Sequence, residues 1–161
     1  MNMLCAACTF AVKRANMVNI YMHAVLIVAN ADKPFDEALT SDVSSFVRTA
    51  LTYKGVACID LCILPDHLHM LLKVQPQTDL SKVLETLKYW LQDFTLRHSS
   101  QRPFEWDSRL WLVSKSPADI PFMQKYFRKQ PAYHAVSNVE QEWADMMDLE
   151  EIAEEEVLQV S

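Results

Sequence analysis

The sequence contains one glycine, Gly55, among 161 residues. Phosphate-binding loops of the P-loop and dinucleotide-binding kinds need several glycines at fixed spacing, because their backbone approaches the phosphates closely. Nucleotide-dependent mechanisms of these two types are therefore excluded. Long apolar runs are lacking too: the best candidate, residues 21–29, is short and includes His23, whereas a membrane span needs about 18 or more apolar residues. The sequence excludes a membrane-spanning protein.

Basic residues are absent from the end of the chain. Residues 1–130 hold all 15 Lys and Arg residues and 12 of the 21 acids, whereas the last 31 residues hold 9 acids and no Lys or Arg. The net charge of -6 therefore hides a mildly basic body followed by an acidic tail. The body is compatible with binding to nucleic acid.

Cysteines are few, at positions 5, 8, 58 and 62. The spacings C-x-x-C and C-x-x-x-C could supply a zinc site, but the second pair lies in a strongly apolar run, where thiols usually act as small buried hydrophobic groups. In the first 17 residues, Lys13 and Arg14 follow small apolar residues, the reverse of a secretory signal. These features argue against a disulfide framework and predict a cytoplasmic protein.

Half of the residues are apolar and 22% are charged, which is typical of one compact globular domain and excludes a mostly disordered chain. Hydrophobic periodicity predicts strands at residues 21–28, 56–64, 67–74 and 110–113, and helices at 35–53, 80–98 and 117–130. Ser116, Pro117 and Asp119 mark the start of the third helix, and Pro131 is expected to end it. The order β-α-β-β-α-β-α predicts an α+β fold, an antiparallel sheet with helices mainly on one face.

Two histidines share one face of the predicted strand 67–74. Alternation sends His67 and His69 to the same side, where two imidazoles two residues apart can converge on one divalent metal ion. The preceding strand is expected to place Ala57, Ile59, Leu61 and Ile63 on one face and Asp60 on the other. If the hairpin register places the aliphatic rows under the helices, Asp60 shares the histidine face as a further candidate ligand. A short H-x-H motif also occurs by chance, and many surface histidines have no function.

A tyrosine with cationic neighbours lies on the predicted helix 117–130. Tyr126 and Gln130 are four residues apart and so share a face, with Lys125, Arg128 and Lys129 around them. A tyrosine in this setting can attack a phosphoryl group beside a metal ligand. The alternative is a surface tyrosine over an exposed basic helix end.

Together these motifs resemble the single-tyrosine HUH transposases of small insertion sequences and their REP-associated relatives. The matching segments are L-P-D-H-L-H-M-L-L at 64–72, D-L-S-K-V-L-E-T-L-K-Y-W at 79–90, W-D-S-R-L-W-L-V-S at 106–114 and Q-K-Y-F-R-K-Q-P-A-Y-H at 124–134. They occur in the family's order and cover residues 21–143. The resemblance implies a ferredoxin-like or RRM-like fold, a homodimer, and a bacterial or archaeal cytoplasmic protein associated with DNA.

The resemblance also implies a mechanism. His67, His69 and Gln130 would hold a divalent ion, Mg²⁺ or Mn²⁺, and no nucleotide would be needed. The Tyr126 oxygen would attack a phosphate of single-stranded DNA next to a hairpin, giving a 5′-phosphotyrosine and a 3′-hydroxyl that allow strand transfer. The phosphate charge would be offset by Lys125, Arg128, Lys129, Arg109 and Lys115.

The expected organisation is an N-terminal extension at 1–18 that is poorly ordered, a catalytic domain at 19–137 and an acidic helical segment at 138–161. The acidic segment is interpreted as a helix packed on the body, or alternatively as a cover over the basic site. Three functions are open: an active transposase, a domesticated HUH endonuclease that processes repeated hairpins, and a catalytically idle nucleic-acid-binding module.

Overall fold

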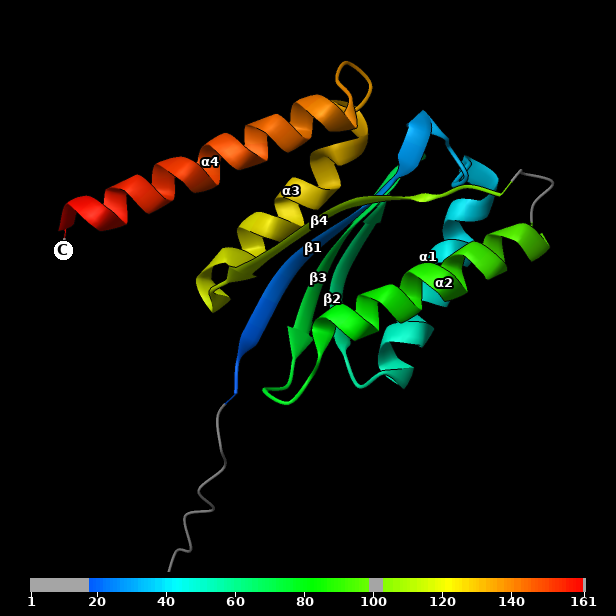
Figure 1. The fold of residues 1–161 in the computed structure, drawn as a ribbon, viewed down its shortest axis with the longest axis horizontal. Coiled ribbons are helices and arrows are strands. Elements are labelled where there is room, and N and C mark those ends of the chain that lie inside the picture. Colours follow the sequence, from blue (N-terminus) through cyan, green and yellow to red (C-terminus); the bar gives the residue numbers. More distant parts are fainter. Residues whose placement is uncertain (1–17, 99–102, 161) are drawn as a thin grey trace, which may run out of the picture.

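The fold is a four-stranded antiparallel sheet between two pairs of helices (Figure 1). The computed structural model describes residues 18–98 and 103–160. The extension predicted at 1–18 lies almost wholly outside the described residues, as do Cys5 and Cys8. The strand order is β2-β3-β1-β4. The elements are β1 (Ile20–Val28), α1 (Glu37–Tyr53), β2 (Ala57–Ile63), β3 (His67–Val74), α2 (Leu80–His98), β4 (Trp106–Lys115), α3 (Ile120–Tyr133) and α4 (Val139–Val160), with short 3-10 turns at Ala29–Ala31 and Pro117–Asp119.

The main core lies between the sheet and the pair α1 and α2. Asp36 starts α1 by accepting a hydrogen bond from the backbone N–H of Leu39 at 2.8 Å, and Gly55, with φ of 73°, allows the chain to turn after the helix. The apolar stripes of both helices then cover one face of β1 and β3. Their fully buried side chains include Val43, Val47, Leu84, Leu87 and Leu91. The predicted α+β architecture is confirmed.

The other face of the sheet is covered by α3 and α4 (Figure 1). Met123 and Phe127 of α3 pack on Leu71 of β3, while Met146 of α4 packs with Trp111 of β4. The helices are thus on both faces rather than mainly on one, because the apolar residues of the acidic segment have a second face of the sheet to bury against. The acidic segment forms α4, and its Trp143 and Met146 pack on the sheet.

The structure differs from the sequence predictions in three places. Pro131 does not end α3, which continues to Tyr133, and the N–H of His134 donates to the Gln130 carbonyl at 2.9 Å. In β2 the alternation slips between Cys58 and Asp60, so Ile59 packs on the α3 side instead of with the aliphatic row under α1 and α2. An irregularity of this kind reverses the faces of the residues beside it. The strand predicted at 110–113 is also longer, at both ends.

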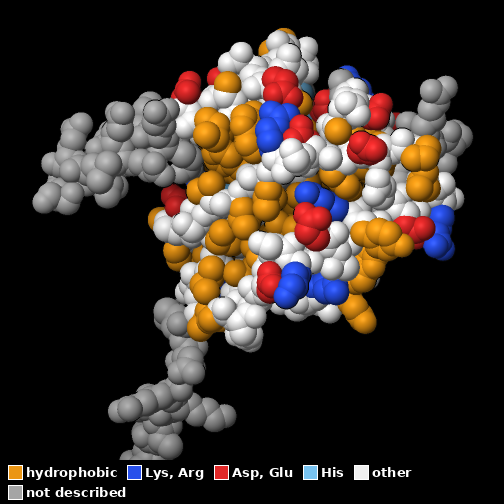
Figure 2. Space-filling view, in the orientation of Figure 1, with side chains coloured by type: hydrophobic (Ala, Val, Ile, Leu, Met, Phe, Trp, Pro, Cys, Tyr) orange, Lys and Arg blue, Asp and Glu red, His pale blue; other side chains and the backbone are white. Residues whose placement is uncertain are grey.

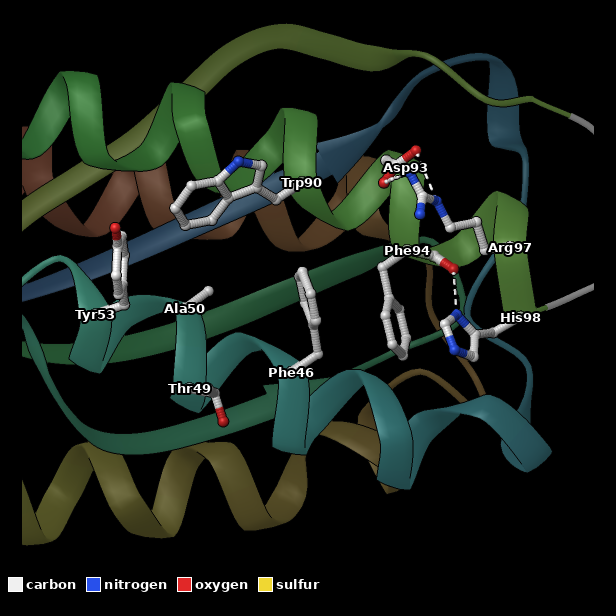
Figure 3. A pocket seen from close by; sticks show the side chains of 9 residues that line it. All are labelled: Phe46, Thr49, Ala50, Tyr53, Trp90, Asp93, Phe94, Arg97 and His98. Atoms are coloured by element: carbon white, nitrogen blue, oxygen red, sulfur yellow. Dashed lines mark hydrogen bonds and ion pairs between the residues drawn. The ribbon is translucent and has the colours of Figure 1, made fainter.

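A groove of about 440 Å³ lies between α1 and α2 (Figure 3). The rings of Phe46 and Phe94 stack across it with centroids 4.4 Å apart, and Asp93 pairs with Arg97 at its rim.

On the face shown in Figure 2, Lys and Arg side chains lie next to Asp and Glu side chains and do not form a single basic patch. Within the described residues, every helix is too short or too polar to cross a lipid bilayer.

Candidate functional site

The two histidines of the H-x-H motif lie in the middle of the sheet. β3 is flanked by β1 and β2, and its register sets His67 opposite Ile27 and His69 opposite Val25. Both imidazoles are 0% exposed and face α3 and α4, on the side away from α1 and α2. The predicted sharing of one face is confirmed, because the two-residue period of a strand fixes it.

One nitrogen of each ring is held by a neighbouring side chain. Nδ1 of His67 lies 2.6 Å from Oδ1 of Asp66, and Nδ1 of His69 lies 3.2 Å from Nε2 of His23 on β1. The other nitrogen, Nε2, is buried in both rings and makes no hydrogen bond of good geometry. An imidazole fixed through one nitrogen, with the other free and aimed into a site, is the arrangement found in histidines that bind metal ions.

A carboxylate from α4 enters the same space. Glu142, in the first turn of α4, is 3% exposed. Its Oε2 lies 2.9 Å from Nε2 of His134 and 3.3 Å from Nε2 of His67, and its Oε1 lies 3.4 Å from Nε2 of His69. The ligand atoms of His67, His134 and Glu142 are all within 4.8 Å of one another. This group could hold a metal ion.

Tyr126 and Gln130 reach the same carboxylate from α3. The Tyr126 hydroxyl donates to Oε1 of Glu142, and Nε2 of Gln130 donates to that oxygen at 2.6 Å. Gln130 is buried, and its own Oε1 has no hydrogen-bond partner. The Tyr126 ring meets that of His69 edge to face, with centroids 5.7 Å apart. The helix therefore brings the tyrosine and the amide predicted from the sequence to the histidine pair.

Two cavities border the tyrosine. One, of about 170 Å³, lies between Tyr126, Trp111 and Lys115, and the other, of about 290 Å³, lies beside Lys129 and Glu142. Tyr126 itself is half-buried. Burial and the nearby Glu142 carboxylate raise the pKa of the Tyr126 hydroxyl well above its usual range. At neutral pH the phenol is protonated, so its attack on phosphorus requires a proton acceptor.

The buried charges adjust to one another. Burial would lower the pKa of His67, but the adjoining carboxylates of Asp66 and Glu142 outweigh this and raise it. Burial lowers the pKa of His69 in spite of Glu142, and burial with the adjoining His69 lowers that of His23 to about 2. Burial would raise the pKa of Glu142, but the adjoining imidazoles of His67 and His69 hold it well below its usual range. The carboxylate is therefore ionised and His23 neutral at neutral pH.

Asp60 does not join this group. It lies on β2 opposite Leu71, and its Oδ1 accepts a hydrogen bond from the N–H of Leu61 at 2.9 Å. The group of possible metal ligands found among the described residues includes neither Asp60 nor the cysteines Cys58 and Cys62. Burial raises the pKa of the Cys62 thiol to about 12, which suits a small buried group better than a thiolate ligand.

The predicted DNA-binding cations divide into two sets. Lys125, Arg128 and Lys129 are exposed on α3 beside Tyr126, and Lys115 lines the smaller cavity. Arg109 instead makes ion pairs at 2.7 Å with Asp107 and with Glu140 of α4. Its guanidinium is engaged within the protein, so the expectation that Arg109 offsets phosphate charge is not supported.

Three residues at the centre of the site were not predicted. His134 had a signal, because Tyr126, Gln130 and His134 follow at steps of four residues, but the helix was expected to end at Pro131. The signal for His23 was a histidine inside an apolar strand. Glu142 had none, because its place depends on how α4 packs against β1 and β4.

A known family matches the part of the chain that carries His67, His69, Tyr126 and Gln130. The model of a family described as IS200-like transposases matches residues 16–130. The chain belongs to the IS200-like transposase family. It is thus a transposase, an enzyme of DNA transposition, and the predicted resemblance is confirmed. No curated protein matches the chain.

Two solved structures are similar to this transposase in fold. A crystal structure at 1.90 Å resolution assigned as a transposase of Deinococcus radiodurans R1 is 18% identical, with a TM-score of 0.57 over 73% of this chain and 95% of the other. A REP-associated tyrosine transposase bound to a REP hairpin is 13% identical, with a TM-score of 0.58 over 75% of this chain and 72% of the other. His134 and Glu142 lie beyond the residues that the family model matches.

Proposed function

We propose that this transposase cleaves and rejoins single-stranded DNA through a covalent bond to Tyr126. One observation carries the proposal: the Tyr126 hydroxyl and Nε2 of His69 both contact Oε1 of Glu142, so the nucleophile and the H-x-H pair open onto one space. A phosphate group that entered this space would meet the phenol and the histidine ligands together.

The residues present fit a divalent ion. Nε2 of His67, Nε2 of His69 and Oε1 of Gln130 are buried atoms without hydrogen-bond partners, and we propose that they bind Mg²⁺ or Mn²⁺. Such an ion would polarise the scissile phosphate and offset its charge. Asp66 and His23 would keep the two imidazoles oriented.

In the proposed reaction the Tyr126 oxygen forms a bond to phosphorus while the bond from phosphorus to the 3′ oxygen breaks. The products are a 5′-phosphotyrosine and a 3′-hydroxyl. The proton that leaves the phenol ends on the departing 3′ oxygen. Glu142 already accepts the hydrogen bond from this phenol and can take the proton first. Attack by another 3′-hydroxyl reverses the step and joins new ends, without a nucleotide cofactor.

The proposed substrate is single-stranded DNA that bears a hairpin. This proposal is supported by the structurally similar REP-associated transposase, which is bound to a REP hairpin. The exposed Lys125, Arg128 and Lys129 offer charge for the backbone beside Tyr126. A homodimer and a cytoplasmic location remain predictions from the family resemblance.

The test is covalent capture of DNA. The purified protein is incubated with labelled single-stranded oligonucleotides that contain hairpins from its own genomic flanks, with Mn²⁺ or with EDTA, and adducts are separated in denaturing gels. We expect a metal-dependent adduct that Tyr126→Phe abolishes. Tyr133→Phe is the matched control, because Tyr133 lies on the same helix but donates to Asp145. DNA binding without any adduct would favour the idle binding module, and a hairpin-bearing element in the flanks would separate a mobile transposase from a domesticated endonuclease.

A further inference from the structure

Three imidazoles meet the Glu142 carboxylate. His67 and His69 reach it from β3, and His134 reaches it from the end of α3, with distances from Nε2 to the carboxylate oxygens of 2.9 to 3.4 Å. Ligand atoms about 2.1 Å from one ion lie about 3 Å apart when they meet at a right angle. The distances from Glu142 to the imidazoles are therefore close to those between neighbouring ligands of one ion, and the ligand atoms of His67, His134 and Glu142 all lie within 4.8 Å of one another.

The carboxylate is held in place by the packing of α4. Asn138 accepts a hydrogen bond from the Gln141 N–H at 2.9 Å and so starts the helix. Met146 is buried on the sheet, and the ring of Trp143 meets that of Trp111 with centroids 5.7 Å apart. A ligand supplied by a helix with such anchors is positioned before an ion arrives.

Burial of this carboxylate needs an explanation. Removing an ionised carboxylate from water is costly unless opposite charge and hydrogen bonds compensate for it. Glu142 is 3% exposed, whereas Glu140 and Asp145 on the same helix are exposed. No Lys or Arg forms an ion pair with Glu142 among the described residues; its partners are imidazoles, an amide and a phenol. A bound cation would supply the compensating charge.

We propose that Glu142 and His134 are ligands of the metal ion together with His67, and that the resulting nitrogen-rich centre takes a transition-metal ion in preference to Mg²⁺. The inference rests on the proposed function and changes its metal centre, because the tail after residue 130 becomes part of it. Imidazole binds transition metals well, whereas Mg²⁺ prefers an all-oxygen shell. Gln130, which donates to Oε1 of Glu142, would then orient the carboxylate as well.

The test measures metal affinity directly. The untagged, metal-free protein is titrated with CoCl₂ by calorimetry and by the visible absorption of bound Co²⁺, because an affinity tag of histidines would bind the probe. We expect one Co²⁺ ion per chain, which a large excess of MgCl₂ does not displace. Glu142→Gln and His134→Asn should each weaken the affinity at least about tenfold. Glu85→Gln is the control, because Glu85 lies on α2, where it pairs with Lys88 outside the site, and its loss should leave the affinity unchanged.

The opposite result is equally clear. If Glu142 only covers the histidines while the metal is absent, Glu142→Gln will bind Co²⁺ as tightly as the unchanged protein or more tightly, and the proposal is wrong. Circular dichroism checks the fold of each variant. Glu142→Asp, which keeps the charge but shortens its reach, should fall between the unchanged protein and Glu142→Gln. The two proposals can fail separately. If the unchanged protein forms the Tyr126 adduct but Glu142→Gln binds Co²⁺ with unchanged affinity, this inference is rejected and the proposed function stands.

Discussion

The Tyr126 hydroxyl on α3 donates a hydrogen bond to the Glu142 carboxylate on α4, 16 residues later in the chain. The bond links the proposed nucleophile of the transposase to a helix that lies beyond the segment matched by the family model. A phosphate that approaches Tyr126 must either displace Glu142 from the phenol or use it as the proton acceptor. The reactivity of this tyrosine therefore depends on the acidic tail.

His69→Asn should remove one imidazole from the site while leaving a side chain that fills part of the space. We expect the rate of adduct formation to fall by at least about a hundredfold, because stabilisation of charge on the reacting phosphate is lost. The measurement is the rate of phosphotyrosine formation in Mn²⁺. His98→Asn is the matched control, since His98 ends α2 and contacts the Phe94 carbonyl. An undiminished rate in His69→Asn would show that the histidine pair has no part in the reaction.

Asp66→Asn should make the stability of the metal-free protein less dependent on pH. The pKa of folded His67 is raised above its unfolded value of 6.5, because the adjoining carboxylates of Asp66 and Glu142 outweigh its burial. The stabilisation is therefore complete below pH 6.5 and is lost as the pH rises through the folded pKa. We expect Asp66→Asn to cost about 1–2 kcal/mol of unfolding free energy at pH 6 and less at pH 9.

Urea unfolding in EDTA at both pH values measures this difference. Asp79→Asn is a suitable control, because Asp79 is exposed at the start of α2 and pairs with Lys82. If Asp66→Asn lowered the unfolding free energy equally at pH 6 and pH 9, protonation of His67 would not contribute to its interaction with Asp66.

The local parts of the site were predictable from the sequence. His67 and His69 share a face because a strand repeats every two residues, and Tyr126 and Gln130 share one because a helix repeats every 3.6. Glu142 was not predictable in this way. Its position follows from the packing of Met146 against the sheet and from the turn between α3 and α4, which are interactions between distant segments.

The errors have local physical causes. Pro131 lacks an N–H and disfavours helical geometry in the residue before it, so a helix end was expected there. The helix continues instead to Tyr133, and the N–H of His134 donates to the Gln130 carbonyl. The added turn is what brings His134 to the carboxylate. The register shift in β2 between Cys58 and Asp60 could not be predicted from the sequence, because an apolar residue such as Ile59 can pack on either face of the sheet.

Arg109→Ala should loosen α4 from β4. The guanidinium pairs with Asp107 and Glu140 and lies 5.1 Å from the centre of the Trp143 ring. Because the Arg109 side chain is 31% exposed, solvent weakens these pairs, and we expect a loss of about 1 kcal/mol in unfolding free energy. Hydrogen exchange should show faster opening of the backbone amides in the first turns of α4. Arg128→Ala, an exposed change on α3, should leave that exchange unaltered.

Lys125→Ala combined with Lys129→Ala should weaken the binding of single-stranded DNA and reduce its salt dependence. Each lost contact with a phosphate lowers the slope of log affinity against log salt by about 0.7 for single strands, so loss of both should lower it by about 1.4. Fluorescence anisotropy across a range of salt concentrations measures this slope. Lys82→Ala combined with Arg97→Ala removes two charges from α2, where Lys82 pairs with Asp79 just before the helix and Arg97 pairs with Asp93. If the α2 variant reduced the slope of log affinity against log salt as much as the α3 variant, Lys125 and Lys129 would not contact the DNA backbone specifically. The proposal that the DNA strand passes beside Tyr126 along α3 would then be wrong.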